Sequence, residues 1–265
     1  MTIHNTSDLS VQINPDYFHQ SEALANRLQL PLVEAAVAGA TNSYVLVYTD
    51  KGLALQQTGV KADGPVYVDY LGGASEYRRN KGGGELIVKA VSGPKDTKPS
   101  VLDVTAGLGR DCFVLASWGY DVTALERSPV VFSLLEDGLQ RASLLGDVDL
   151  RSIVQRLQIV HADAIQYLNE HATSNPPDVV VIDPMFPPSK KSALVKKEMR
   201  AFHYVVGPDQ DGSLLLDASL AAANYRVVVK RPKKAEFLAG KKPNFSLDGK
   251  AIRFDIYTKK TFAKK

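Results

Sequence analysis

The sequence is poor in cysteine, with Cys112 alone among 265 residues. One cysteine excludes an intrachain disulfide and a cysteine-cluster metal site, so we expect Cys112 to be a small buried residue of a helix. Long apolar runs are also lacking. The hydrophobic stretches have the length of a strand and are interrupted by charged residues. The first ten residues are polar and have no basic-then-apolar leader. We therefore expect a soluble, cytoplasmic protein with no membrane partner and no metal.

A hydrophobic content of 45% supports a substantial core, in one large domain or in a large and a small one. The formal net charge is only +3, but it is unevenly distributed. Residues 230–265 hold 12 Lys or Arg against 3 Asp or Glu, a net of +9, which leaves −6 for residues 1–229. A polyanionic partner such as nucleic acid would explain this asymmetry, and so would a solvated, solubilising face.

Residues 1–75 differ in pattern from the rest and predict a small α+β domain. A helix is expected first, followed by a hairpin turning at Lys51-Gly52 and one more short strand. The expected helix is Ser21–Leu30, and the expected strands are Ser43–Asp50, Leu53–Gly59 and Val66–Tyr70. The sequence leaves open whether this domain docks substrate or gives structural support.

Residues 76–99 are interpreted as a linker and a helix. Tyr77–Glu85 is basic and then rich in glycine, and it leads into a helical stretch at Leu86–Val91. The glycine-rich part suits a flexible linker or a backbone loop that binds phosphate or cofactor, and the residues do not decide between these alternatives.

Residues 100–265 alternate between strand and helix patterns. This alternation predicts an α/β fold with a doubly wound, mostly parallel sheet. The expected strands are Val101–Thr105, Asp121–Glu126, Leu157–His161, Asp178–Ile182, Tyr225–Lys230 and Arg253–Thr258. Ligands of such sheets bind beyond the carboxyl ends of the strands, so the residues that follow each strand are the candidate site.

The first of these strands runs from Asp103 into a turn with Gly107 and Gly109, which predicts a binding site for a nucleotide-like cofactor. The G-x-G-x-x-G pattern is incomplete, since Cys112 stands at the third glycine position. Glu126 ends the next strand about twenty residues later, where a carboxylate can accept both hydroxyls of a cofactor ribose. The alternative for Glu126 is a surface acid at the end of a strand.

Two later strands end in acids as well. Asp163 follows the third strand, and a carboxylate there could accept the exocyclic amine of an adenine. The fourth strand is a continuous apolar run that ends in Asp183-Pro184-Met185-Phe186, where prolines stiffen the loop. Oxygen acceptors beside an aromatic ring suit a planar base that bears an amine, although a purely structural proline turn has the same composition.

A basic stretch follows this loop. Val195, Met199 and Phe202 can share the inner face of a helix, which leaves the cations to project elsewhere. We predict that these cations contact RNA phosphates, with a solvated helix face as the alternative. The predicted RNA-binding residues are Lys190, Lys191, Lys196, Lys197 and Arg200.

Several of these stretches together closely resemble the ribosomal RNA small subunit methyltransferase J family. They are Thr105–Asp111, Leu125–Pro129, Asp183–Pro187, Lys191–Arg200, Val227–Pro232 and Arg253–Tyr257. The resemblance covers about residues 77–257, and residues 1–75 match only loosely. It implies a class I, Rossmann-like methyltransferase that transfers a methyl group from S-adenosylmethionine (SAM) to the exocyclic N2 of a guanosine near the 3′ end of 16S rRNA. The implied partner is 16S rRNA or the small ribosomal subunit.

The resemblance also implies roles for individual residues. Asp183, Pro184 and Phe186 form the implied catalytic loop, in which Met185 departs from the acid-Pro-Pro-aromatic pattern of amino-group methyltransferases. Together with Asp103, Gly107 and Gly109 from the turn, the implied SAM contacts are Arg110, Asp111, Glu126, Arg127, Asp163, Ala164 and Asp183.

Three other functions remain open at this point. A non-catalytic RNA-binding or ribosome-assembly factor could retain SAM only as structure. A nicotinamide-dependent oxidoreductase is opposed by Cys112 and by the acid-proline-aromatic loop. An adenine-N6 methyltransferase would share the loop chemistry, so the identity of the methylated base follows from the resemblance alone.

Overall fold

The computed structural model divides the chain into two compact units. The described residues are 9–35, 44–59, 62–72, 86–94, 97–171, 174–185, 200–201, 204–207 and 211–262. The first unit comprises residues 1–69, 128–141 and 186–208, and the second comprises residues 70–127, 142–185 and 209–265. Each unit is therefore assembled from separate stretches, and the domain boundaries predicted at residues 75 and 99 stay predictions.

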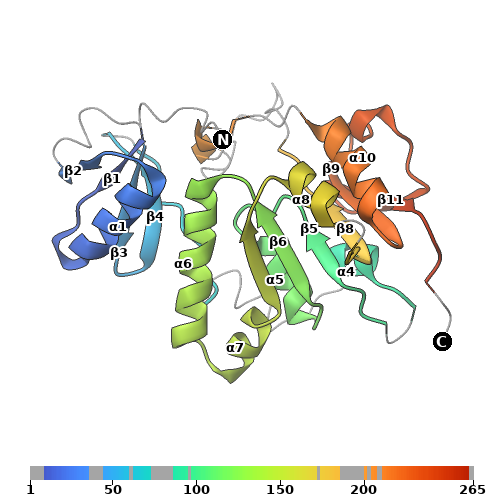
Figure 1. The fold of residues 1–265 in the computed structure, drawn as a ribbon, viewed down its shortest axis with the longest axis horizontal. Coiled ribbons are helices and arrows are strands. Elements are labelled where there is room, and N and C mark those ends of the chain that lie inside the picture. Colours follow the sequence, from blue (N-terminus) through green and yellow to red (C-terminus); the bar gives the residue numbers. More distant parts are fainter. Residues whose placement is uncertain are drawn as a thin grey trace. The chain divides into compact units, whose positions relative to one another are not determined.

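The first unit contains a four-stranded sheet in the order β2-β1-β3-β4 (Figure 1). Its elements are β1 (Leu9–Gln12), η2 (Pro15–Tyr17), α1 (Phe18–Leu28), β2 (Leu32–Val33), β3 (Tyr44–Thr49) and β4 (Gly52–Gln57). The predicted hairpin is confirmed, because β3 and β4 pair antiparallel and Gly52 supplies a φ of 104° at the turn. The strand predicted at residues 66–70 is wrong: Val66 makes only an isolated bridge to Leu55. Strands β1 and β2 are not among the strands predicted from the sequence.

A partly buried polar network connects helix α6 (Pro129–Leu145) to the rest of the first unit. The Asp137 carboxylate accepts from the Leu53 backbone N–H at 3.0 Å and from Arg141 Nε at 2.8 Å. Arg141 in turn donates to the Val68 carbonyl at 2.5 Å. These bonds satisfy backbone groups that would otherwise be buried without partners, so part of α6 belongs structurally to the first unit.

Gly138 of α6 is a glycine because Val68 leaves no room for a side chain. A Cβ on Gly138 would lie 2.5 Å from the Val68 Cβ and 3.1 Å from its carbonyl oxygen. By helix propensity alone Gly138→Ala would stabilise the protein by about 1 kcal/mol. We expect it instead to destabilise the protein by about 1–3 kcal/mol, as overpacking does, when urea unfolding is followed by circular dichroism. Ser143→Ala, on an exposed face of the same helix, is the control, and a raised midpoint for Gly138→Ala would contradict the packing argument.

The second unit contains a seven-stranded sheet in the order β10-β11-β9-β8-β5-β6-β7. The five strands from β9 to β7 are parallel, whereas β11 runs antiparallel to both β9 and β10. The strands are β5 (Val101–Asp103), β6 (Val122–Glu126), β7 (Leu157–His161), β8 (Val179–Ile182), β9 (Arg226–Pro232), β10 (Phe245–Asp248) and β11 (Ile252–Thr258). The predicted doubly wound, mostly parallel sheet is confirmed, and only β10 was not expected.

Helices connect these strands and bury the sheet. They are α4 (Leu86–Val91), α5 (Arg110–Ser117), α7 (Val148–Val154), α8 (Ala164–His171), α10 (Gly212–Ala222) and the short η3 (Leu238–Gly240). Leu168 of α8 and Leu216 of α10 pack into one hydrophobic cluster with Val180 of β8 and Val227 of β9. This core fixes the central strands, and so it fixes where their carboxyl ends lie. Among the described residues no helix is long and apolar enough to span a membrane.

Candidate functional site

The glycine turn after β5 has the backbone conformation that a close approach to a ligand requires. Gly107 and Gly109 have φ values of 55° and 68°, in the left-handed region that favours glycine. A Cβ added to Gly107 would meet no atom within 4 Å, so the backbone there is open to approach. Helix α5 starts at Arg110, directly after Gly109, and its first N–H groups lie at the same turn.

Asp103 stabilises this turn through hydrogen bonds. Its side chain is buried, and one oxygen accepts from the Thr105 backbone N–H at 2.9 Å while the other accepts from the Cys112 thiol at 3.1 Å. Burial raises the pKa of Asp103 to about 6. Cys112 is buried as predicted, and burial together with Asp103 raises the pKa of its thiol, so it is a hydrogen-bond donor rather than a reactive thiolate.

Tyr70, which is not part of the turn, packs against it. Its hydroxyl lies 3.3 Å and 3.4 Å from the carbonyl oxygens of Leu108 and Gly109, and its ring stacks on Phe113 with centroids 4.6 Å apart. A buried tyrosine hydroxyl needs such acceptors. Residue 70 was expected to end a strand of the small domain, so its contact with the turn was not anticipated.

Glu126 lies where the spacing from the glycine turn predicts. It ends β6 in a buried position, and its carboxylate accepts from the Gly107 backbone N–H at 3.0 Å. Because β5 and β6 pair in parallel, both carboxyl ends face the same edge of the sheet. This contact argues against the alternative of a surface glutamate.

Asp163, Ala164 and Arg127 also lie at this edge. Asp163 caps α8, since its carboxylate accepts from the Gln166 N–H at 3.0 Å, and Ala164 is the first residue of that helix. Arg127 follows Glu126 directly and pairs with Asp211 at 3.0 Å. The sequence carries a signal for this cap, because an acid, Asp163, is followed three residues later by Gln166.

Asp183 follows β8 at the same edge, next to the glycine turn. Its backbone N–H donates to the Thr105 hydroxyl at 2.6 Å, so Thr105 links the loop after β8 to the turn after β5. The side chain is partly exposed, and Pro184 is the next described residue of the loop. Asp183 and Glu126 thus come from β8 and β6, the two strands that flank β5.

Lys230 is a site residue that sequence reasoning missed. It lies in β9, one residue beyond the Val229–Ile182 pair, and is therefore level with Asp183. Its Nζ lies 2.7 Å from Asp111 Oδ2 and 2.8 Å from Asp183 Oδ2. Burial alone would lower the pKa of Lys230, but the two carboxylates outweigh burial and raise it above its ordinary value. A charged ammonium thus bridges the first turn of α5 and the loop after β8.

The remaining predicted residues belong to the first unit or lie outside the described residues. Phe186 and the four lysines of the predicted RNA-binding helix, Lys190, Lys191, Lys196 and Lys197, lie outside the described residues. Arg200 is described, and it pairs with Asp63 at 2.5 Å. A phosphate that binds Arg200 would have to compete with that carboxylate. Among the described residues no group of three or more His, Cys, Asp or Glu side chains is placed to hold a metal ion.

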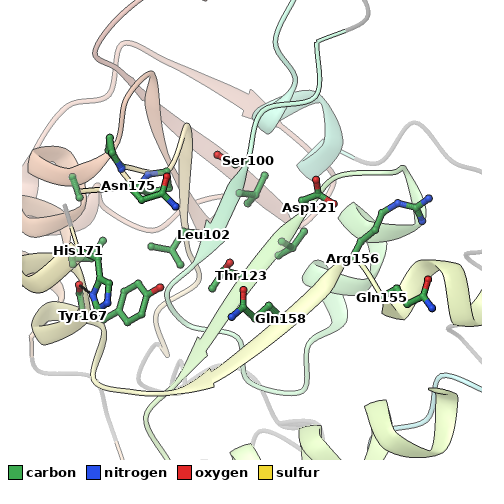
Figure 2. Close-up of a pocket in the computed structure, with 16 residues that line it drawn as sticks. Ser100, Leu102, Asp121, Thr123, Gln155, Arg156, Gln158, Tyr167, His171 and Asn175 are labelled. Atoms are coloured by element: carbon green, nitrogen blue, oxygen red, sulfur yellow. Dashed lines mark hydrogen bonds between the residues drawn. The ribbon is translucent and has the colours of Figure 1, made fainter. Parts of the chain in front are cut away.

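The second unit also has a cavity of about 340 Å³, shown in Figure 2, away from these residues. Ser100, Asp121 and Arg156 line it, and they directly precede β5, β6 and β7. The cavity therefore lies at the amino ends of the strands, whereas Glu126 and Asp183 follow the carboxyl ends. By the rule for doubly wound sheets it is not the predicted cofactor site.

The fold and the glycine turn define a class of protein, and comparison with known proteins agrees with it. A family model described as "Putative SAM-dependent methyltransferase" matches residues 24–259. A solved SAM-dependent methyltransferase from Neisseria gonorrhoeae is 37% identical, with a TM-score of 0.72 over 94% of this chain and 95% of that one. The chain is a SAM-dependent methyltransferase with a Rossmann-like, class I fold.

Curated relatives narrow the class to one family. The ribosomal RNA small subunit methyltransferase J of Pseudomonas syringae pv. syringae is 48% identical over 93% of this chain and 89% of its own length. The protein of the same name from Cellvibrio japonicus is 46% identical over 92% of this chain and 95% of its own length. The chain belongs to the ribosomal RNA small subunit methyltransferase J family.

Proposed function

We propose that this protein transfers the methyl group of SAM to the exocyclic N2 of a guanosine near the 3′ end of 16S rRNA, in the cytoplasm. The substrate is 16S rRNA, free or in the small ribosomal subunit. One observation carries the proposal: Asp183 is connected through Thr105 to the glycine turn that Glu126 holds. In this proposal the acceptor for the amine and the site for SAM share one edge of the sheet.

The residues at this edge fit SAM. The open backbone at Gly107 and the start of α5 suit close approach by a ligand. Glu126, which accepts from the Gly107 N–H in the same turn, is proposed to accept from the ribose hydroxyls. Asp163 would accept from the adenine amine. Asp103 contributes by holding the turn, since both of its oxygens are already bonded within it. Bound SAM supplies an electrophilic methyl group on a sulfonium.

The chain's own contribution to the reaction is mainly positioning. The guanine N2 is a poor nucleophile because its lone pair is delocalised into the ring, so orientation of the amine matters most. Asp183 and the Pro184 carbonyl accept the hydrogens of that amine, and Phe186 stacks on the splayed base. A carboxylate is a weak base for the neutral amine. The proton therefore leaves after the methyl group has been transferred, when N2 carries a positive charge, and Asp183 or water accepts it.

Lys230 orients the Asp183 carboxylate for this role. One carboxylate oxygen accepts from the ammonium at 2.8 Å, and the amine of the guanine is proposed to meet the other oxygen. The same ammonium holds Asp111 at the start of α5, so the acceptor loop and the cofactor turn are fixed to each other. Lys190, Lys191, Lys196, Lys197 and Arg200 are proposed to hold RNA phosphates.

Transfer of a tritiated methyl group from SAM tests the proposed function. We expect the purified protein to label 16S rRNA from cells that lack it, and to label rRNA from wild-type cells much less because the site is already methylated. A binding or assembly factor would incorporate no label into either RNA. Binding of NAD without binding of SAM would instead favour an oxidoreductase.

A further inference from the structure

A ridge of three exposed lysines lies beyond the catalytic edge of the second unit. The lysine ridge consists of Lys233 and Lys234, which follow β9, and Lys250, in the turn between β10 and β11. Ile252 pairs with Pro232, so the start of β11 and the end of β9 lie together. Figure 1 shows β9 and β11 side by side.

The register of the sheet places this ridge relative to the acceptor loop. Asp183 is level with Lys230 across the β8–β9 pair. Lys233 is three residues further along the chain and directly follows Pro232, the last residue of β9. The ridge therefore lies beyond Asp183, at the carboxyl end of the parallel strands.

The backbone of the ridge is held rigidly. Buried Arg253 donates to the Lys233 carbonyl at 2.7 Å and is itself paired with buried Asp255 at 2.8 Å. The Lys233 N–H donates to the Ala251 carbonyl at 2.9 Å. Buried Arg231 donates to the Glu236 carbonyl at 2.9 Å, which closes the loop after β9. Two buried arginines thus bind the backbone, while the side chains of the three lysines are exposed and Lys233 Nζ also donates to the Gly249 carbonyl at 3.3 Å.

The lysines of the ridge have few carboxylate partners. Lys233 lies 3.8 Å from Asp248, and both side chains are about half exposed, so the pair is loose and contributes little. A pre-ordered, exposed row of cations beside a base-accepting loop fits the phosphates of a nucleic acid backbone, because ordering the loop costs nothing further on binding.

We propose that the lysine ridge binds the phosphates that flank the target nucleotide and so aligns the RNA over Asp183. This inference rests on the proposed function, because it takes 16S rRNA as the partner. It adds a contact surface on β9–β11 that is separate from the predicted basic helix at residues 190–200. It also assigns a role to three of the twelve cations in residues 230–265.

The test compares two triple variants of the full-length protein that remove the same number of charges. The ridge variant is Lys233→Ala/Lys234→Ala/Lys250→Ala. The control variant is Lys242→Ala/Lys259→Ala/Lys260→Ala, whose exposed lysines lie near the opposite end of the same strands, around the pairing of Thr258 with Arg226. Affinity for unmethylated 16S rRNA is measured between 50 and 200 mM salt, and the affinity for SAM is measured in parallel.

For the ridge variant we expect the slope of log affinity against log salt to become shallower by about 2, as loss of three phosphate contacts predicts. We expect its KM for rRNA to rise about tenfold, with SAM affinity unchanged and the control variant close to wild type. Equal changes in both variants, or no change in either, would overturn the inference. Failure of the proposed function itself would look different, since the wild-type protein would then transfer no methyl group.

Discussion

Asp183→Ala is expected to reduce methyl transfer to rRNA by about 10²- to 10³-fold while the protein still binds SAM. The physical reason is that a positioned acceptor at the reacting amine is lost, and losses of this size follow removal of one such group from an active site. Lys230 stays paired with Asp111 in this variant, so no buried charge is left without a partner. Steady-state transfer of labelled methyl and calorimetric binding of SAM separate the two effects.

Asp183→Asn removes the charge of the side chain but keeps its shape, and we expect this variant to be nearly as inactive as Asp183→Ala. Asp183 offers one oxygen to the Lys230 ammonium, and we propose that the other faces the guanine amine. An amide has only one oxygen, so in either orientation one of these two donors meets an N–H group. Near-normal turnover by either variant would remove Asp183 from the mechanism.

Lys230→Met is expected to lower turnover by about 10- to 100-fold and to weaken SAM binding. Without the ammonium, the carboxylates of Asp111 and Asp183 face each other in a partly buried site with no cation between them. Loss of a neighbouring positive charge raises the pKa of a carboxyl group. Activity that needs the Asp183 carboxylate is then lost at a higher pH as the solution is acidified, so the acidic limb of the pH–rate profile moves upward.

Lys230→Arg distinguishes this positioning role from a general effect on folding. Arginine keeps the charge and can donate to both carboxylates, so we expect it to restore the position of the acidic limb and much of the turnover. If Lys230→Met and Lys230→Arg lose activity equally and neither shifts the pH profile, Lys230 serves only the packing of β9.

The sequence predicts the parallel sheet well because its buried strands are continuous apolar runs, as at Val179–Ile182. It also predicts that Glu126 ends the strand after the glycine turn, since the distance from that turn to the next strand end is set by one helix. Strand β10 escaped prediction because it is a short edge strand that is mostly exposed and has no clear alternation. Local pattern thus recovers strands such as β8, whose burial on both faces produces a continuous apolar run.

The contacts of Lys230 could not be predicted from local sequence pattern. In the sequence it is the first of many C-terminal cations, and its partners lie 119 and 47 residues away. Only the register of β9 against β8 brings it level with Asp183. The signal that would have found it is its position at the end of a strand, where the rule applied to β5, β6 and β8 holds equally for β9.

The most direct test of the central claim is to map modified nucleotides in 16S rRNA from cells with the protein, without it, and with Asp183→Ala in its place. Nucleoside mass spectrometry of protected fragments identifies both the position and the methylated atom. We predict one N2-methylguanosine near the 3′ end that is present only with the wild-type protein. An unchanged modification pattern, or a methyl group on an adenine N6, would contradict the account.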